Sequence, residues 1–99
     1  DRKTVLQKIM AGIQAHAGDL AAAITSEIGA PVGLANAAQI PSGLGHFDAV
    51  FLGLENYKFQ VTRGSTLIVK EAAGVCGFIT PWNWPLNQIA CKVASVNPL

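Results

Sequence analysis

Apolar residues recur at every third or fourth position through the first part of the chain, a spacing that predicts helices with one buried face. One helix is expected over residues 5–17, with Gly18 at its end and Asp19 as the N-cap of the next helix. The second helix is expected over residues 20–28 and should stop at Gly29. Together the two segments predict a short helical hairpin.

A longer apolar stripe follows this hairpin. Residues 32–39 are compatible with a helix, but Pro41 interrupts the segment and should lie in the first turn of a new helix. The new helix should end near Tyr57, and its apolar stripe consists of Leu44, Phe47, Phe51 and Leu54. We expect this stripe to face the core.

The pattern changes after Gly64, where β-branched residues replace the helical spacing. A strand is expected over residues 66–70, within a segment 61–74 that carries a strand pair, and a further strand over residues 75–80. A helix should begin behind Pro85. The order of helices, strand pair and strand-turn-helix unit predicts an α/β fold.

The last predicted strand stops at an asparagine held between two prolines. Pro81 removes a ladder donor and ends the strand, and Pro81 and Pro85 bias Thr80 and Trp84 to extended conformations. Asn83 therefore lies in a rigid turn. Its carboxamide offers two donors without a charge, which suits a developing oxyanion. The same side chain could instead form an Asx-type turn with nearby backbone, and the residues alone favour neither interpretation.

The composition indicates part of a larger protein. The chain has 99 residues, of which 51% are apolar and only 13% charged, where about 25% charged is usual. A free-standing domain of this size would leave much of its apolar surface in water. We expect other residues to cover it.

Charge and spacing exclude several kinds of partner. The net charge is +1 and the basic residues are scattered, so neither nucleic acid nor an anionic membrane is an expected partner. The uncharged stretch between Glu71 and Lys92 is long enough for a membrane span, but its prolines and asparagines argue against one. Cys76 and Cys91 are expected to be buried reduced thiols of a cytoplasmic protein.

Other patterns are weaker candidates for chemistry. Gly43 and Gly45 begin like a dinucleotide fingerprint, but a third glycine and a preceding strand are missing, so close helix packing or a loose first turn is favoured. Cys76, inside an apolar run, is poorly placed for a nucleophile. His16 and His46 stand alone, and no metal site is expected.

One motif resembles a known family. The sequence GVCGFITPWNWPL at residues 74–86, followed by Lys92, closely resembles the strand-turn-helix segment of the NAD(P)-dependent aldehyde dehydrogenase superfamily. The sequence EIGAP at residues 27–31 is similar to a second segment of that family, in which an acidic residue and a glycine precede proline. The likeness therefore covers nearly the whole chain.

The resemblance implies an enzyme of several hundred residues that oxidises an aldehyde to a carboxylic acid with NAD or NADP. In the family, a cysteine thiolate attacks the aldehyde, hydride leaves the thiohemiacetal, and a glutamate-activated water releases the acid. Residues 1–99 would then form part of the cofactor-binding domain. That part comprises helices over 1–58, strands and an oligomerisation segment over 61–74, and over 75–97 the first strand-turn-helix unit of a Rossmann-like domain.

The resemblance also implies roles for particular residues. Asn83 corresponds to the family's oxyanion donor and is the expected catalytic residue of this segment. The expected cofactor-binding residues line the cleft largely through main-chain atoms near the ribose, and they are Ile79, Thr80, Pro81, Trp82 and Asn83. The implied partners are a small aldehyde, the rest of the enzyme chain and further copies in a homo-dimer or homo-tetramer.

The sequence departs from the family pattern in what it lacks. The motifs that carry the nucleophilic cysteine and the general-base glutamate are absent, Cys76 and Glu71 do not replace them, and this segment alone is expected to be inactive. Residues 95–98 also differ from the usual Pro-Ala-Leu continuation. An alternative interpretation is a non-catalytic truncated interaction module. A binder of sugar or nucleotide that uses Trp82 and Trp84 is a third.

Overall fold

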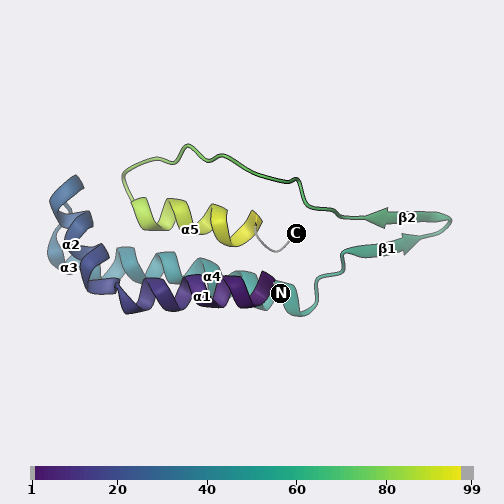
Figure 1. Ribbon diagram of the computed structural model, residues 1–99, viewed down its shortest axis with the longest axis horizontal. Coiled ribbons are helices and arrows are strands. Elements are labelled where there is room, and N and C mark those ends of the chain that lie inside the picture. Colours follow the sequence, from purple (N-terminus) through teal and green to yellow (C-terminus); the bar gives the residue numbers. More distant parts are fainter. Residues whose placement is uncertain (1, 97–99) are drawn as a thin grey trace.

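The computed structural model describes residues 2–96 and consists of packed helices with a two-stranded hairpin that projects from them (Figure 1). Residue 1, where the expected helical segment begins, and residues 97–99, which include the end of the expected strand-turn-helix unit at residue 97, lie outside the described part. The elements are α1 (Arg2–Ala15), α2 (Ala17–Ile28), α3 (Val32–Leu34), the π-helical η1 (Ala35–Gln39), α4 (Ile40–Glu55), β1 (Gln60–Arg63), β2 (Thr66–Val69) and α5 (Pro85–Val96).

The predicted helices form, with small shifts at their ends. The junction between α1 and α2 lies at His16, two residues before the predicted Gly18, and no side-chain hydrogen bond caps α2. At the other end of α2, Gly29 adopts φ 70° and its N–H donates to the Thr25 carbonyl at 3.0 Å, as the predicted glycine stop requires. Pro41 lies in the first turn of α4, as predicted, but it does not interrupt the segment, because α3, η1 and α4 follow one another without a break.

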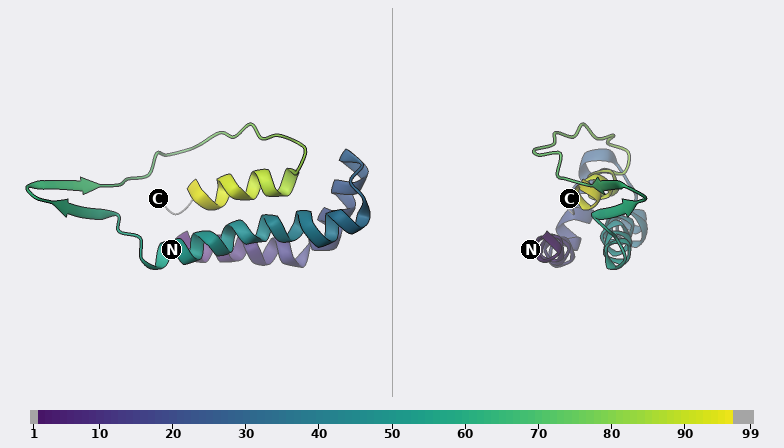
Figure 2. Two further views of the ribbon diagram at one scale, coloured as in Figure 1. Left: turned by 180° about the vertical axis from the view of Figure 1, so that it is seen from behind. Right: turned by 90° about the vertical axis from the view of Figure 1, so that its right-hand side faces the viewer.

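Helix α4 is the centre of the packing. It contacts both α1 and α5, and in the end-on view of Figure 2 these two helices lie on different sides of it. One buried cluster joins the three helices, and its members are Leu6, Phe47, Ala90 and Ala94. A second cluster lies where α2 meets η1, and its members are Ala21, Ile24, Ala30, Ala35 and Ile40. The alanines let the helix axes approach closely.

The strands form a single antiparallel hairpin among residues 2–96. Gln60 pairs with Val69 and Arg63 with Thr66, and Gly64 in the turn adopts φ 61°. The predicted strand pair is thus formed. The hairpin points away from the helices, which contributes to overall extents of 56 × 23 × 19 Å (Figure 1). The radius of gyration is 16.3 Å, above the ~13 Å of a globular 100-residue domain.

The strand predicted over residues 75–80 is absent from the structure. Residues 71–84, which we call the arm, run from the hairpin back alongside α5 to its first turn without regular structure (Figure 1). Val75 and Ile79 are fully exposed. A strand needs a neighbour to accept its backbone hydrogen bonds, and within residues 2–96 no other strand lies beside the arm. Of the expected strand-turn-helix unit, only the helix is present.

Candidate functional site

The candidate site is the end of the arm, where it joins α5. The Gln88 N–H donates to the Trp84 carbonyl at 2.9 Å, so Trp84 stands at the N-cap position and Pro85 is the first helical residue. Asn83 therefore lies directly before the N-terminus of α5. This end of a helix carries a partial positive charge and favours nearby negative charge.

The Asn83 side chain is exposed and has no hydrogen-bond partner among residues 2–96. The Asx-type turn that the sequence left open is therefore not formed. Both N–H groups of the carboxamide are free to donate to a ligand. The two bracketing prolines limit the backbone on either side, which reduces the freedom lost when a ligand binds.

The residues before Asn83 form one continuous exposed stretch. Ile79 is fully exposed, the exposed fraction of Trp82 is 80%, and Thr80 is half-buried. Within residues 2–96, no backbone-to-backbone hydrogen bond involves residues 71–83. The five sequence-predicted site residues lie together because they are adjacent in the chain, and their main-chain donors and acceptors remain available.

The first turn of α5 rests on α4 through two contacts, of which the sequence predicted the close helix packing at Gly43 but not the hydrogen bond at His46. A Cβ built on Gly43 would lie 2.7 Å from Leu86 Cγ, so only glycine allows the two helices to come this close. One turn along α4, His46 Nε2 lies 2.7 Å from Asn87 Oδ1, and both side chains are half-buried. Gly43 and Gly45 lie inside α4, which contradicts the dinucleotide-fingerprint interpretation and confirms close packing for Gly43 alone.

Comparison with known proteins places these residues in a family. The sequence matches the aldehyde dehydrogenase family over residues 1–96. The chain belongs to that family. It is 50% identical over 94 residues to 3-succinoylsemialdehyde-pyridine dehydrogenase of Pseudomonas sp. The aligned residues make up 94% of this chain and 20% of that protein. It is 44% identical over 95 residues to a protein named "Putative aldehyde dehydrogenase" of Staphylococcus aureus (strain USA300), with 96% and 20% covered.

The family assignment confirms the resemblance carried by residues 74–86 and 27–31. This aldehyde dehydrogenase chain spans 20% of the length of the curated relatives it matches. Its mixture of helices with a small two-stranded sheet fits an α/β assignment for the residues described. Among those residues, no helix is both long and apolar enough to cross a membrane.

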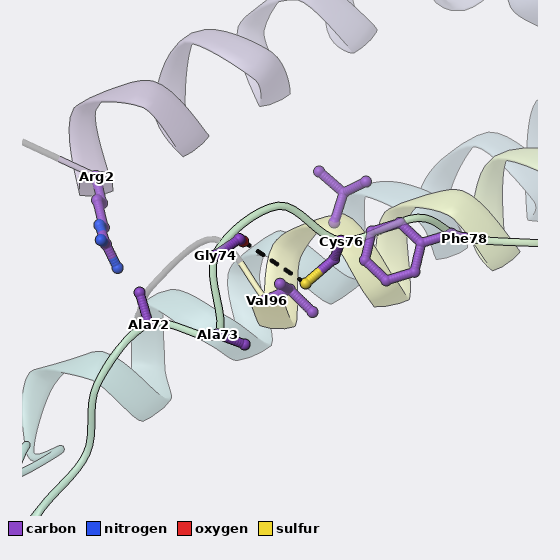
Figure 3. Close-up of a pocket in the computed structure, with 8 residues that line it drawn as sticks. Arg2, Ala72, Ala73, Gly74, Cys76, Phe78 and Val96 are labelled. Carbon is purple, nitrogen blue, oxygen red and sulfur yellow. Dashed lines mark hydrogen bonds between the residues drawn. The ribbon is translucent and has the colours of Figure 1, made fainter.

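The arm of this aldehyde dehydrogenase chain also borders an open hollow of about 350 Å³ beside the C-terminal half of α5. Figure 3 shows Cys76 and Phe78 on the arm above Val96, with the Arg2 guanidinium at one end. Cys76 is exposed and Cys91 half-buried, so the expectation of two buried thiols is wrong for Cys76, because the arm lies outside the core. Cys76 Sγ makes a weak contact of 3.8 Å with the Gly74 carbonyl.

Charged and metal-binding side chains do not gather at either place. Within residues 2–96, no group of three or more His, Cys, Asp or Glu is arranged to hold a metal ion. His16 is exposed and lies 3.5 Å from the Asp19 carboxylate. The chemistry that the site can offer is therefore uncharged hydrogen-bond donation from Asn83, next to exposed main-chain groups.

Proposed function

We propose that this chain is part of an NAD(P)-dependent aldehyde dehydrogenase, in which Asn83 donates a hydrogen bond to the aldehyde oxygen as negative charge develops there. The observation that carries the proposal is the state of the Asn83 carboxamide, which is exposed and without a partner among the described residues, directly before the α5 N-terminus. Family membership supports the reaction type.

The proposed role follows from the charge that appears on the substrate. When a nucleophile attacks an aldehyde, the carbonyl oxygen becomes an oxyanion, and donors already aimed at its position stabilise it without reorganising. A neutral carboxamide does so without forming a fixed ion pair with the product. Loss of one such donor lowers kcat by about 10²–10³-fold in comparable sites.

Residues 79–82 fit one wall of a cofactor cleft. Their main-chain groups are free of backbone hydrogen bonds within residues 2–96. The largely exposed Trp82 ring offers a flat apolar surface for the ribose or an aromatic ring of the cofactor. NAD(P), when bound, accepts the hydride that leaves the aldehyde carbon. We propose that Ile79, Thr80, Pro81 and Trp82 contact it together with Asn83.

The remaining parts of the machinery are proposed to come from residues outside this sequence. We infer that they supply the nucleophilic cysteine, the general base and the strands against which the arm pairs as the first strand of a Rossmann-like domain. The hairpin of β1 and β2 is the proposed contact to further copies in a homo-dimer or homo-tetramer. Its β2 residues are all exposed.

The test is Asn83→Ala in the enzyme that contains these residues, assayed by NADH or NADPH formation with propanal and benzaldehyde. We expect kcat to fall by about 10²–10³-fold, and the Kd for the cofactor to change little, because one donor to the oxyanion is lost. Asn36→Ala is the matched control, since Asn36 is exposed on η1 and donates only to the Val32 carbonyl. A large loss of cofactor affinity with normal kcat would refute the oxyanion role.

The mass of the protein separates this proposal from the interaction-module alternative. An intact native mass far above 10.3 kDa, with dehydrogenase activity, is the expected result. A stable native protein of that small mass, inactive with every aldehyde and bound to another polypeptide, would favour the module. The assay needs no knowledge of the natural aldehyde, because a family member should turn over some simple aldehyde slowly.

A further inference from the structure

The position of Asn83 depends on what holds the first turn of α5. On its N-terminal side the arm has no backbone hydrogen bond within residues 2–96, so among these residues Asn83 is restrained only through its junction with α5. On its C-terminal side Asn83 is two residues from Pro85, and the bond from Gln88 to the Trp84 carbonyl joins this turn to the helix. Within the described residues, any shift of the first turn therefore moves Asn83.

Beyond its first turn, helix α5 buries two alanines in the cluster that joins it to α4. Ala90 and Ala94 are fully buried against Phe47, which permits a close approach of the axes. Apolar burial is not directional, so these contacts define the rotation of α5 about its axis less sharply than a hydrogen bond does. Other contacts must define the orientation of its first turn.

The hydrogen bond between His46 and Asn87 gives the first turn that orientation. Asn87 Oδ1 can only accept, so His46 Nε2 carries the hydrogen and donates across 2.7 Å. Among the described residues this is the one side-chain hydrogen bond between α4 and α5. Its geometry is directional, unlike the packing of Leu86 on Gly43 beside it.

We propose that His46 is a positioning residue, which holds the first turn of α5 through Asn87 and so keeps the Asn83 carboxamide aimed at the substrate oxygen. This inference rests on the proposed function of Asn83. His46 itself lies on α4 and donates to Asn87, so its effect on turnover passes through Asn83.

The first test replaces the hydrogen-bond donor with an apolar ring. His46→Phe, in the enzyme that contains these residues, should lower kcat for propanal about tenfold, which is less than the ~10²-fold associated with a 1 Å misplacement. His46→Gln keeps an N–H donor and should restore kcat to within about threefold of the unchanged enzyme. Asn87→Leu should match His46→Phe, and His16→Phe, at an exposed histidine of the α1–α2 junction, should have no effect.

The second test distinguishes positioning from general damage to the fold. In an Asn83→Ala background, His46→Phe should lower kcat by less than about twofold, because the group it positions is gone. A full tenfold loss in that background would overturn the inference, and so would His46→Gln behaving like His46→Phe. A normal kcat for Asn83→Ala alone would instead refute the proposed function on which the inference rests.

Discussion

Gly43→Ala tests most directly whether α4 and α5 pack closely at Gly43 and Leu86. The added Cβ would lie 2.7 Å from Leu86 Cγ and 3.0 Å from Leu86 Cδ2. Carbon atoms pack best at about 3.5–4.0 Å, so either Leu86 must leave its rotamer or α5 must move away. Gly45, two residues along the same helix, has no atom within 4 Å of its Cβ position and is the matched control.

Two opposing contributions determine how much Gly43→Ala changes the free energy of unfolding. Alanine is favoured over glycine inside a helix by about 1 kcal/mol, and this gain applies equally at both positions of α4. Overpacking a well-filled contact costs about 1–3 kcal/mol and applies only at Gly43. We expect Gly45→Ala to raise the free energy of unfolding by about 1 kcal/mol, and Gly43→Ala to lie about 1–3 kcal/mol below it.

The assay is urea-induced unfolding followed by tryptophan fluorescence, with Trp84 half-buried next to α5 as the reporter. A double variant locates the clash: once Leu86→Ala has removed the obstructing atoms, Gly43→Ala should become stabilising, as it is at Gly45. Equal stability of the two single alanine variants would refute the close approach of α4 and α5. It would also remove one of the two supports of the first turn.

Three further outcomes follow from burial and backbone geometry. Phe47→Ala should lower the free energy of unfolding by about 3–5 kcal/mol, since Phe47 is fully buried. Leu52→Ala, at a position 68% exposed, should change it by less than about 0.5 kcal/mol. Equal effects of the two substitutions in urea titrations would contradict the burial of Phe47. Gly29→Ala should cost about 1–2 kcal/mol because an L-residue is strained at φ 70°, and an unchanged urea midpoint would contradict that conformation. In the 99-residue polypeptide, a thiol reagent should label Cys76 faster than Cys91, because Cys76 is exposed. In the proposed longer enzyme, Cys76 should react more slowly, because the arm would be paired there. A Cys76 labelling rate that is the same in both forms would argue against that pairing.

Much of the helical part could be predicted because its signals are local. Gly29 ends α2 because only glycine adopts the left-handed conformation there easily. Pro85 begins α5 because its missing N–H is not needed in the first turn. Pro41 lies in the first turn of α4, directly after the π-helical η1. The junction at His16 was misplaced by two residues, because Gly18 and Asp19 resemble a helix end and an N-cap, whereas both lie in the first turn of α2.

The strand over residues 75–80 could not be settled from its own residues. Its β-branched composition does favour an extended backbone, and the arm is extended, but a strand is defined by a ladder with a neighbour. Within residues 2–96 the only strands are those of the hairpin, and both already pair with each other. Val75 and Ile79 are therefore fully exposed, although their residue types favour a buried strand.

Asn83 could be recognised from its neighbours in the sequence, whereas the role of His46 depends on a contact between two helices. Asn83 is recognisable because the two prolines that restrain it are its sequence neighbours. His46 and Asn87 are 41 residues apart, and their contact depends on the register of two helices. On α4, Gly43, His46 and Phe47 share a face at the spacing of three and four residues, which reads equally well as a core stripe. The close approach permitted by Gly43 brings that face within hydrogen-bonding distance of α5. A glycine without chemistry of its own therefore decides whether His46 can reach Asn87 at all.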